Sequence, residues 1–269
     1  MKCVLCLSLT GIEILASGSA DGSIIIWNVE SGERLFVLKA PGRGILDLAV
    51  DPETLNYDSE SEGEGQGEVI IFSASSLGEI RRWAIKKDLS GAREIESDKP
   101  IIQHETSVYK LSFDMDGDLW TASADTTIQC LSRHHSFTPS LTLPDNDYVR
   151  SVAIDDVGGY VVSAGRDESV KVWDKGSGVL KGVFEGHWEE VMDVVVVGRR
   201  AVSGGIDGTV RVWGLDAQSL ERAAKEAEDL RNGVEEVEVA EGEVEGKENP
   251  FGIDEDEMKE LEELMEDGE

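Results

Sequence analysis

Apolar and β-branched residues alternate with polar residues in short runs between residue 3 and about residue 215, and glycine or aspartate bounds most of these runs. The clearest runs are Ile24-Ile25-Ile26-Trp27, Val170-Lys171-Val172-Trp173 and Val210-Arg211-Val212-Trp213. Such runs are typical of β-strands rather than helices. Asp21-Gly22 and Asp207-Gly208 precede two of them, and this dipeptide tolerates the positive φ of a tight hairpin. The pattern therefore predicts an all-β domain built from antiparallel strands.

One arrangement of residues recurs five times along this domain. A serine is followed by an aspartate after four residues and by a tryptophan six residues later, in Ser17/Asp21/Trp27, Ser163/Asp167/Trp173 and Ser203/Asp207/Trp213. Two further copies are degenerate: Leu77 replaces the aspartate in the second, and Leu131 replaces the tryptophan in the third. The chain therefore consists largely of one repeated unit.

The aspartate positions of the five copies are 21, 77, 125, 167 and 207, so the copies follow one another at 56, 48, 42 and 40 residues. Four strands in about 40 residues cannot close a core alone and must stack on their neighbours, which predicts a β-propeller. The longer spacing at the second copy indicates an insertion, residues 52–68, with six acidic and no basic residues. We expect this insertion to be a disordered loop, in which Ser59 and Ser61 precede glutamates as candidate phosphorylation sites.

The fifth copy carries the residues of a known family. Gly186-His187, Val191, Ser203, Asp207 and Trp213-Gly214, with Trp173-Asp174 one repeat earlier, resemble the WD40 repeat over residues 3 to about 215. The resemblance implies a WD40-type β-propeller with five recognisable four-stranded blades. It also implies a hydrogen-bonded chain of His187, Ser203, Asp207 and Trp213, which only the fifth copy holds complete.

The other copies depart from this set of four. Pro41 takes the histidine position in the second copy and Asp145 takes it in the fourth, while the third keeps His104 but lacks the tryptophan. A complete hydrogen-bonded network stabilises a fold more than an incomplete one does. We therefore expect blades two and three to be less stable than the others.

Both ends of the repeat array are incomplete in the sequence. The histidine position of the first repeat would precede Met1, and the fifth repeat has no fourth strand because the chain turns helical from Ala217. We expect either a chain that lacks about two N-terminal blades or a five-blade propeller with an unclosed seam. An unclosed seam would expose a strand edge.

Charge narrows the range of partners. The chain has 25 Lys and Arg against 56 Asp and Glu, a net charge of −31, and residues 219–269 hold 21 acidic against 5 basic residues. Such a surface repels phosphate, which argues against direct binding to nucleic acid or an anionic membrane. The three cysteines, Cys3, Cys6 and Cys130, form no framework of pairs, so we expect buried thiols and a cytoplasmic or nuclear location.

The acidic tail divides into three segments. Residues 217–232 have a narrow apolar stripe and predict a helix, while 233–253 predict a disordered acidic linker. In 254–267, Asp254 and Glu257 fit a capping box, and one face carries four apolar residues, Met258, Leu261, Leu264 and Met265. This acidic amphipathic helix suits a partner's groove or the surface of a basic client; the alternative is a tail that only keeps the protein soluble.

The resemblance also suggests where partners bind. In the WD40 family they usually dock on the narrow top face of the propeller, near the residue before the Asp of the tetrad and those after the His position. In this sequence these positions include Arg43, Tyr148, Arg166 and Trp188. Trp, Tyr and Arg are the residues enriched in interface hot spots. The alternative is that Trp188 only covers the next blade and that Arg166 pairs with Asp147.

Other chemistry has little support in the sequence. Asp114 to Asp118 resembles the start of a calcium loop, but it coincides with a repeat turn and lacks the glutamate at position twelve. Cys3 and Cys6 are half of a zinc site. The chain has four histidines, two of them at tetrad positions, and no phosphate-binding loop or nucleophile elbow. We therefore expect no catalysis, no cofactor and no metal.

These observations predict a non-catalytic protein interaction scaffold of a multiprotein complex, which binds partners through the top face and the acidic tail. One alternative is an acidic chaperone for a basic client such as a histone or a ribosomal protein. Another is a substrate receptor of a ubiquitin ligase; such receptors resemble Trp-Asp-x-Arg, but Gly176 follows Trp173-Asp174-Lys175 here.

Overall fold

The computed structural model describes residues 3–9, 12–41, 44–55 and 67–226, and for residues 3–9 and 12 only the backbone. The chain divides into two units, Met1–Ala227 and Glu228–Glu269, and the described residues belong to the first. Several predicted features lie outside the described residues: Arg43, Ser59, Ser61, and the tail with Met258, Leu261, Leu264 and Met265.

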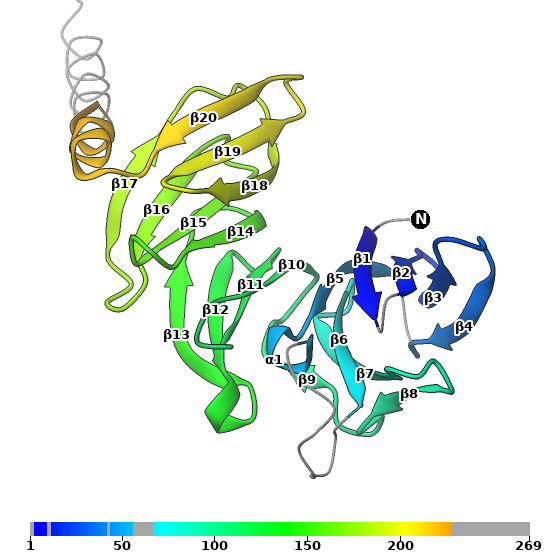
Figure 1. Ribbon diagram of the computed structural model, residues 1–269. Coiled ribbons are helices and arrows are strands. Elements are labelled where there is room, and N and C mark those ends of the chain that lie inside the picture. The colour runs from blue at the N-terminus through cyan, green and yellow to red at the C-terminus, as the bar shows by residue number, and fades with distance from the viewer. Residues whose placement is uncertain (1–2, 10–11, 42–43, 56–66, 227–269) are drawn as a thin grey trace, which may run out of the picture. The chain divides into compact units, whose positions relative to one another are not determined.

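Twenty strands form five antiparallel sheets in chain order (Figure 1). The first sheet contains β1 (Cys3–Leu9), β2 (Ile12–Gly18), β3 (Ser23–Asn28) and β4 (Arg34–Lys39). The second contains β5 (Ile45–Val50), β6 (Glu68–Ser75), β7 (Glu79–Lys86), β8 (Ala92–Ile95) and β9 (Ile101–Ile102). The third contains β10 (Val108–Phe113), β11 (Leu119–Ser123), β12 (Thr127–Ser132) and β13 (Thr138–Pro144).

The fourth sheet contains β14 (Val149–Asp155), β15 (Tyr160–Gly165), β16 (Val170–Asp174) and β17 (Leu180–Phe184). The fifth contains β18 (Val191–Val197), β19 (Arg200–Gly205) and β20 (Val210–Gly214). Two short helical turns complete these elements: α1 (Pro52–Leu55) and the 3-10 turn η1 (Arg133–His135). The five repeats, and a fifth sheet of only three strands within the described residues, agree with the predictions from the sequence.

The second sheet departs from the repeat in two places. Both ends of the segment 52–68, predicted to be a disordered loop, are ordered, because Pro52–Leu55 form α1 and Glu68 begins β6; residues 56–66 lie outside the described residues. The sequence analysis also missed a break in the outer strand: β8 and β9 both pair with β7, and residues 96–100 leave the ladder between them. Glu96 adopts a φ of 46° at the start of this detour.

After β20, residues 217–226 are helical and the rest of the predicted helix 217–232 lies outside the described residues. Leu220 and Ala223 are buried, and both contact the strand β17 at Gly182. The helix therefore packs on the fourth sheet through the apolar stripe that the sequence predicted.

Each sheet buries one face against the first two strands of the next sheet. Ile14, Ala16 and Ile26 of the first sheet share a core with Ile45 and Leu48 of the second. The same arrangement joins the second sheet to the third, the third to the fourth and the fourth to the fifth. The core is therefore four successive layers between sheets, as expected for units that cannot close a core alone.

A buried hydrogen bond recurs within the sheets. The indole N–H of the repeat tryptophan donates to the repeat serine at 2.8–2.9 Å in four of them, in the pairs Trp27–Ser17, Trp83–Ser73, Trp173–Ser163 and Trp213–Ser203. Each bond spans the second and third strands of its sheet and satisfies an indole donor that packing removes from water.

The histidine position is filled in different ways. His187 lies 2.8 Å from both Asp207 and Ser203, which completes the predicted set of four with Trp213. His104 lies 2.8 Å from Asp125 and 2.7 Å from Thr121 in the third sheet.

In the fourth sheet, Lys171 donates to Asp145 and Asp167, which the sequence analysis did not foresee. Burial opposes the charge of Lys171, but the two carboxylates raise its pKa above the usual value. In this sheet Asp145 stands at the histidine position, and the Lys171 amine bridges it to Asp167.

A buried aspartate ends the first strand in three consecutive sheets, and a cation of the following sheet pairs with it. Arg133 binds Asp51 with two hydrogen bonds of 2.6 and 3.0 Å. Lys175 lies 3.0 Å from Asp114, and Arg199 lies 3.4 Å from Asp155. These pairs lock neighbouring sheets in place, because a carboxylate buried without its cation is strongly unfavourable.

Ser73→Ala tests the repeated indole bond where it is most buried. Trp83 would keep its ring position but lose its only acceptor, so we expect a loss of about 1–3 kcal/mol in the free energy of unfolding, measured by urea denaturation. Ser97→Ala, at an exposed serine, is the control and should change little. Equal stability of the two variants would contradict the assigned role of the bond.

The network of the fifth sheet should also weaken in acid. Burial would raise the pKa of Asp207, but the Thr209 N–H and the His187 ring lower it to about 2. Because the folded-state pKa is depressed, Asp207 stabilises the fold above its usual pKa of 3.8, and this contribution is lost as the pH falls toward 2.

We expect Asp207→Asn to lower stability at neutral pH and to flatten its decline over this acid range, as measured by urea denaturation across pH. Asp98→Asn at an exposed position controls for the lost charge. An unchanged decline in Asp207→Asn would show that the group does not contribute.

Candidate protein-interaction face

The loops that hold the predicted binding residues lie at one end of the fourth and fifth sheets. The first strand of each sheet begins at this end and the second strand finishes there, because the two are antiparallel. The Arg166 N–H donates to the Tyr148 carbonyl at 2.9 Å, and the Ile206 N–H donates to the Glu190 carbonyl at 2.9 Å. Each pair of loops is thus fixed by a backbone hydrogen bond at the top of its sheet.

Tyr148 and Arg166 form an exposed pair on the fourth sheet. The guanidinium carbon of Arg166 lies 5.4 Å from the centroid of the Tyr148 ring, which is 39% exposed. Arg166 also approaches Asp147, but at 3.9 Å and with more than half of its side chain in water. Arg166 therefore stacks on Tyr148 and pairs only loosely with Asp147, which leaves most of its side chain exposed.

Trp188 and Arg211 form a similar pair on the fifth sheet. The guanidinium carbon of Arg211 lies 5.6 Å from the Trp188 ring, which is 59% exposed. Ile206 beside it is 57% exposed. Trp188 therefore has most of its surface in water rather than covering a neighbouring blade, and the arginine beside it is Arg211.

The sequence analysis did not single out Arg211. Alternation along β20 places Arg211 on the same face as Trp213, and both side chains approach Gly186. The Nε atom of Arg211 is buried without a hydrogen-bond partner. The position of Arg211 between two valines of a strand was the one feature in the sequence that could have drawn attention to it. Its stacking on Trp188 depends on how the chain turns at Gly186.

An ion pair joins the two exposed pairs. Arg150 at the start of β14 donates to Glu190 before β18 at 2.5 Å. The same guanidinium stacks on Tyr109 of the third sheet, 4.2 Å from the ring centroid. The loops of the fourth and fifth sheets are thus held next to each other by Arg150, which also packs on the third sheet.

At the opposite end of the sheets, Asp114 to Asp118 form the predicted hairpin turn. The N–H groups of Asp116 and Asp118 donate to Asp114 at 3.0 and 2.9 Å, and the Trp120 indole donates to its other oxygen at 3.0 Å. Lys175 also contacts Asp114 and Asp116. The carboxylates therefore serve the turn and the packing of the sheets, and no cluster of metal-ligating side chains occurs within the described ranges.

Cys130 is a buried free thiol, as predicted, and burial raises its pKa to about 11. Cys3 and Cys6 lie on β1, where only the backbone is described. No helix in the described part of the chain has the length and apolar character to span a bilayer.

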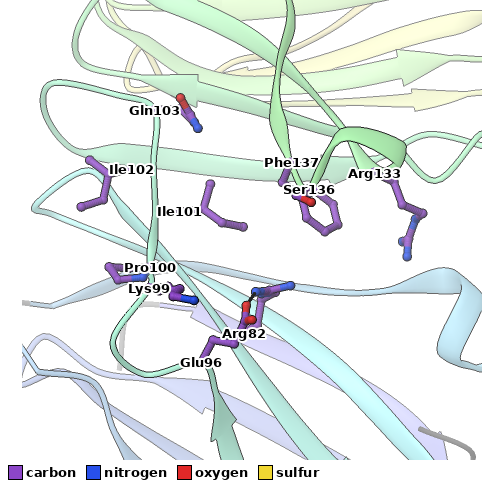
Figure 2. A pocket seen from close by; sticks show the side chains of 10 residues that line it. All are labelled: Arg82, Glu96, Lys99, Pro100, Ile101, Ile102, Gln103, Arg133, Ser136 and Phe137. Atoms are coloured by element: carbon purple, nitrogen blue, oxygen red, sulfur yellow. Dashed lines mark hydrogen bonds and ion pairs between the residues drawn. The ribbon is translucent and has the colours of Figure 1, made fainter. Parts of the chain in front are cut away.

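A cavity of about 630 Å³ lies where the detour 96–100 of the second sheet meets η1 of the third (Figure 2). Arg82, Lys99 and Arg133 line it together with Ile101, Ile102 and Phe137. Glu96 pairs with Arg82, and Asp51 pairs with Arg133, so two of the three cations are already neutralised.

Sequence comparison agrees with the architecture. The pattern of the WD domain, G-beta repeat, matches residues 2–28, 137–174 and 178–214. The chain is a WD40-repeat protein. The first, fourth and fifth repeats carry the match, and they are the copies that retain both the aspartate and the tryptophan of the repeat.

Several curated relatives resemble this WD40-repeat protein. An uncharacterized WD repeat-containing protein of Schizosaccharomyces pombe is 32% identical over 220 residues, which are 80% of this chain and 54% of the relative. Nuclear distribution protein nudF of Aspergillus niger is 28% identical over 173 residues, 64% of this chain and 35% of the relative.

Mitochondrial division protein 1 of Neurospora crassa is 30% identical over 106 residues, 36% of this chain and 16% of the relative. The WD40-repeat chain thus spans about half the length of the first of these relatives and a smaller share of the others.

The exposure of Trp188 can be tested in solution. The other five tryptophans are buried or half-buried, so we expect Trp188→Phe to remove most of the acrylamide-quenchable tryptophan fluorescence. Trp173→Phe should lower the emission but leave the quenchable part in place, because Trp173 is buried. Quenching that persists in Trp188→Phe would contradict the described placement of this side chain.

Proposed function

We propose that this WD40-repeat protein is a non-catalytic interaction scaffold and that it binds a partner protein through the face formed by Tyr148, Arg166, Trp188 and Arg211. One observation carries the proposal: two solvent-exposed aromatic rings, each stacked with an arginine, stand on adjoining sheets that an ion pair holds together. Tyrosine, tryptophan and arginine dominate the residues whose loss most weakens protein interfaces.

The charges on this face favour a partner with acidic side chains set among apolar ones. The nearest carboxylate to Arg166 is that of Asp147, at 3.9 Å. Arg211 stacks on the exposed Trp188 ring and makes no ion pair with any residue that the structure describes. A carboxylate from a partner would give both guanidinium groups a charge-assisted hydrogen bond.

The surroundings of the histidines support a role without catalysis. His104 and His187 are buried and bonded to an aspartate and a hydroxyl, so their ring nitrogens serve the fold. His134 and His135 lie in the short turn η1. We further propose that the protein acts as a subunit of a hetero-complex in the cytoplasm or the nucleus.

A second candidate is an acidic chaperone for a basic client. The net charge of −31 and the concentration of acidic residues in 219–269 favour it. Binding of this kind should weaken steeply with salt, since it is electrostatic and takes place at the surface.

The tagged full chain, recovered from its own cells at moderate salt, tests both candidates by quantitative mass spectrometry. We expect a stoichiometric set of partners whose recovery falls at least about tenfold with Arg166→Glu or Trp188→Ala, because hot spots contribute about 2 kcal/mol or more. Lys181→Glu, at an exposed lysine of β17, is the matched control and should retain them.

A chain that ends at Ala227, and so keeps the helix that packs on β17, separates the two candidates. Partners retained by this chain but lost with Arg166→Glu would support the face. Basic proteins that depend on the tail and are unaffected by Arg166→Glu and Trp188→Ala would support the chaperone and contradict the scaffold.

A further inference from the structure

The cavity between the second and third sheets carries positive charge in an otherwise acidic protein. Arg82, Lys99 and Arg133 line it, and Glu96 is the only carboxylate among its ten lining residues. The chain as a whole has a net charge of −31. The cavity therefore complements an anionic group, whereas a surface of the overall charge repels one.

The three cations differ in how firmly each is already bound to a carboxylate. Arg133 binds the buried Asp51 with two hydrogen bonds and so serves the contact between the sheets. Arg82 pairs with Glu96, whose side chain is 52% exposed, and an ion pair in contact with water is weak. Lys99 makes no ion pair with any carboxylate in the part of the chain that the structure describes. Lys99 and Arg82 are therefore the groups that a ligand's carboxylate can bind.

The cations and the apolar side chains occupy different parts of the cavity (Figure 2). Arg82 and Lys99 lie at the lower end of the view, and Ile101 and Phe137 stand above them. Ile101 and Phe137 are 9% and 7% exposed, while Ile102 beside them is 58% exposed. A ligand that complements this cavity therefore needs an anionic group next to an apolar one.

The backbone around the cavity holds two conformations that side chains rarely adopt. Glu96 has a φ of 46° and Phe137 has a φ of 58°. Both residues line the cavity, one from each sheet. Left-handed backbone at a large residue is costly, and it persists at ligand sites where the surrounding structure enforces it. The strain thus supports a binding role for the cavity.

The exposure of the lining residues indicates a polypeptide rather than a small molecule. Two of the ten residues are buried, and four are exposed: Glu96, Lys99, Ile102 and Ser136. Small molecules bind in concave sites that remove most of their surface from water. A peptide can instead cross an open site and continue beyond both ends of it.

We propose that this cavity is a docking site for an acidic segment of a partner protein. A carboxylate of the segment binds Lys99 and Arg82, and an adjacent apolar side chain packs on Ile102 and Phe137. Glu96 holds the Arg82 guanidinium in the free protein, and the incoming carboxylate takes its place. The site belongs to the second and third sheets, so it is separate from the proposed face on the fourth and fifth and does not depend on it.

A phage-displayed library of short random peptides supplies the probe. It is selected on the full chain and depleted on the Lys99→Glu variant, which removes peptides that bind elsewhere. We expect the surviving peptides to combine aspartate or glutamate with an apolar residue. In fluorescence anisotropy, a labelled peptide of the recovered sequence should bind Lys99→Glu at least about tenfold more weakly than the full chain, because attraction becomes repulsion. Lys39→Glu, at an exposed lysine of β4, is the matched control and should bind normally.

Two further pairs of variants test the charged and the apolar part of the site. Glu96→Gln frees Arg82 and should tighten binding about threefold, whereas Asp98→Asn removes the same charge from an exposed neighbour and should not. Ile102→Asp should weaken binding about tenfold, and Val37→Asp, at a similarly exposed valine of β4, should not. Unchanged affinity in Glu96→Gln would contradict the role assigned to Arg82.

Four results would overturn the proposal. They are a selection that yields no acidic peptides, equal binding by Lys99→Glu and the unchanged chain, peptide binding only to the chain that ends at Ala227, and equally tight binding of citrate. The third result would make the acidic tail the occupant, and the fourth would make it a small anion. Circular dichroism checks that the variants keep the sheet content of the unchanged chain.

Discussion

A small β-sheet with two apolar faces is stable only when something covers both of them, and this constraint determines the organisation of the protein. None of the five sheets has a core of its own; each core lies between two sheets and is made by both. The stability of such an array is close to a sum of contributions from neighbouring units. The interactions that matter most are therefore those that fix one sheet against the next.

Two kinds of polar interaction stabilise the array, one within each sheet and one between neighbouring sheets. The indole bond to serine ties strands within a sheet, while the buried aspartates 51, 114 and 155 reach to cations of the following sheet. The fifth sheet has Val197 where these aspartates stand, so the series ends there, on the sheet whose apolar face is exposed. Electrostatic pairing and apolar burial thus stop at the same sheet.

Much of this architecture could be predicted from the sequence, because each residue type of the repeat favours one kind of local structure. Asp-Gly turns, alternating valines and the spacing of serine, aspartate and tryptophan were enough to place the five sheets and to show that the fifth lacks a strand. The bridging of Asp145, at the histidine position, to Asp167 by Lys171 was not foreseen, because these side chains meet only in the folded sheet.

The candidate face shows the same limit. Tyr148, Arg166 and Trp188 could be named from their offsets in the repeat, but their pairing could not, since it depends on loop conformation. Arg211 was missed because its neighbours mark β20 as an ordinary strand. The break beside the cavity was missed although Ser97, Asp98 and Pro100 are residues that favour turns and interrupt a ladder. The spacing of residues within the repeat predicts which strand or loop holds a side chain. It does not predict contacts between loops, which depend on the folded structure.

The break in the outer strand of the second sheet has a consequence for how the protein tolerates change. Pairing with β7 resumes after the detour with its register shifted by four residues, since Ile95 is opposite Arg82 but Ile101 is opposite Ile80. The strand can thus be interrupted without loss of pairing on either side. Such a position is a natural place for an inserted peptide tag or a fluorophore, and for length variation during evolution, because added residues would extend into solvent and leave the packed sheets unaltered.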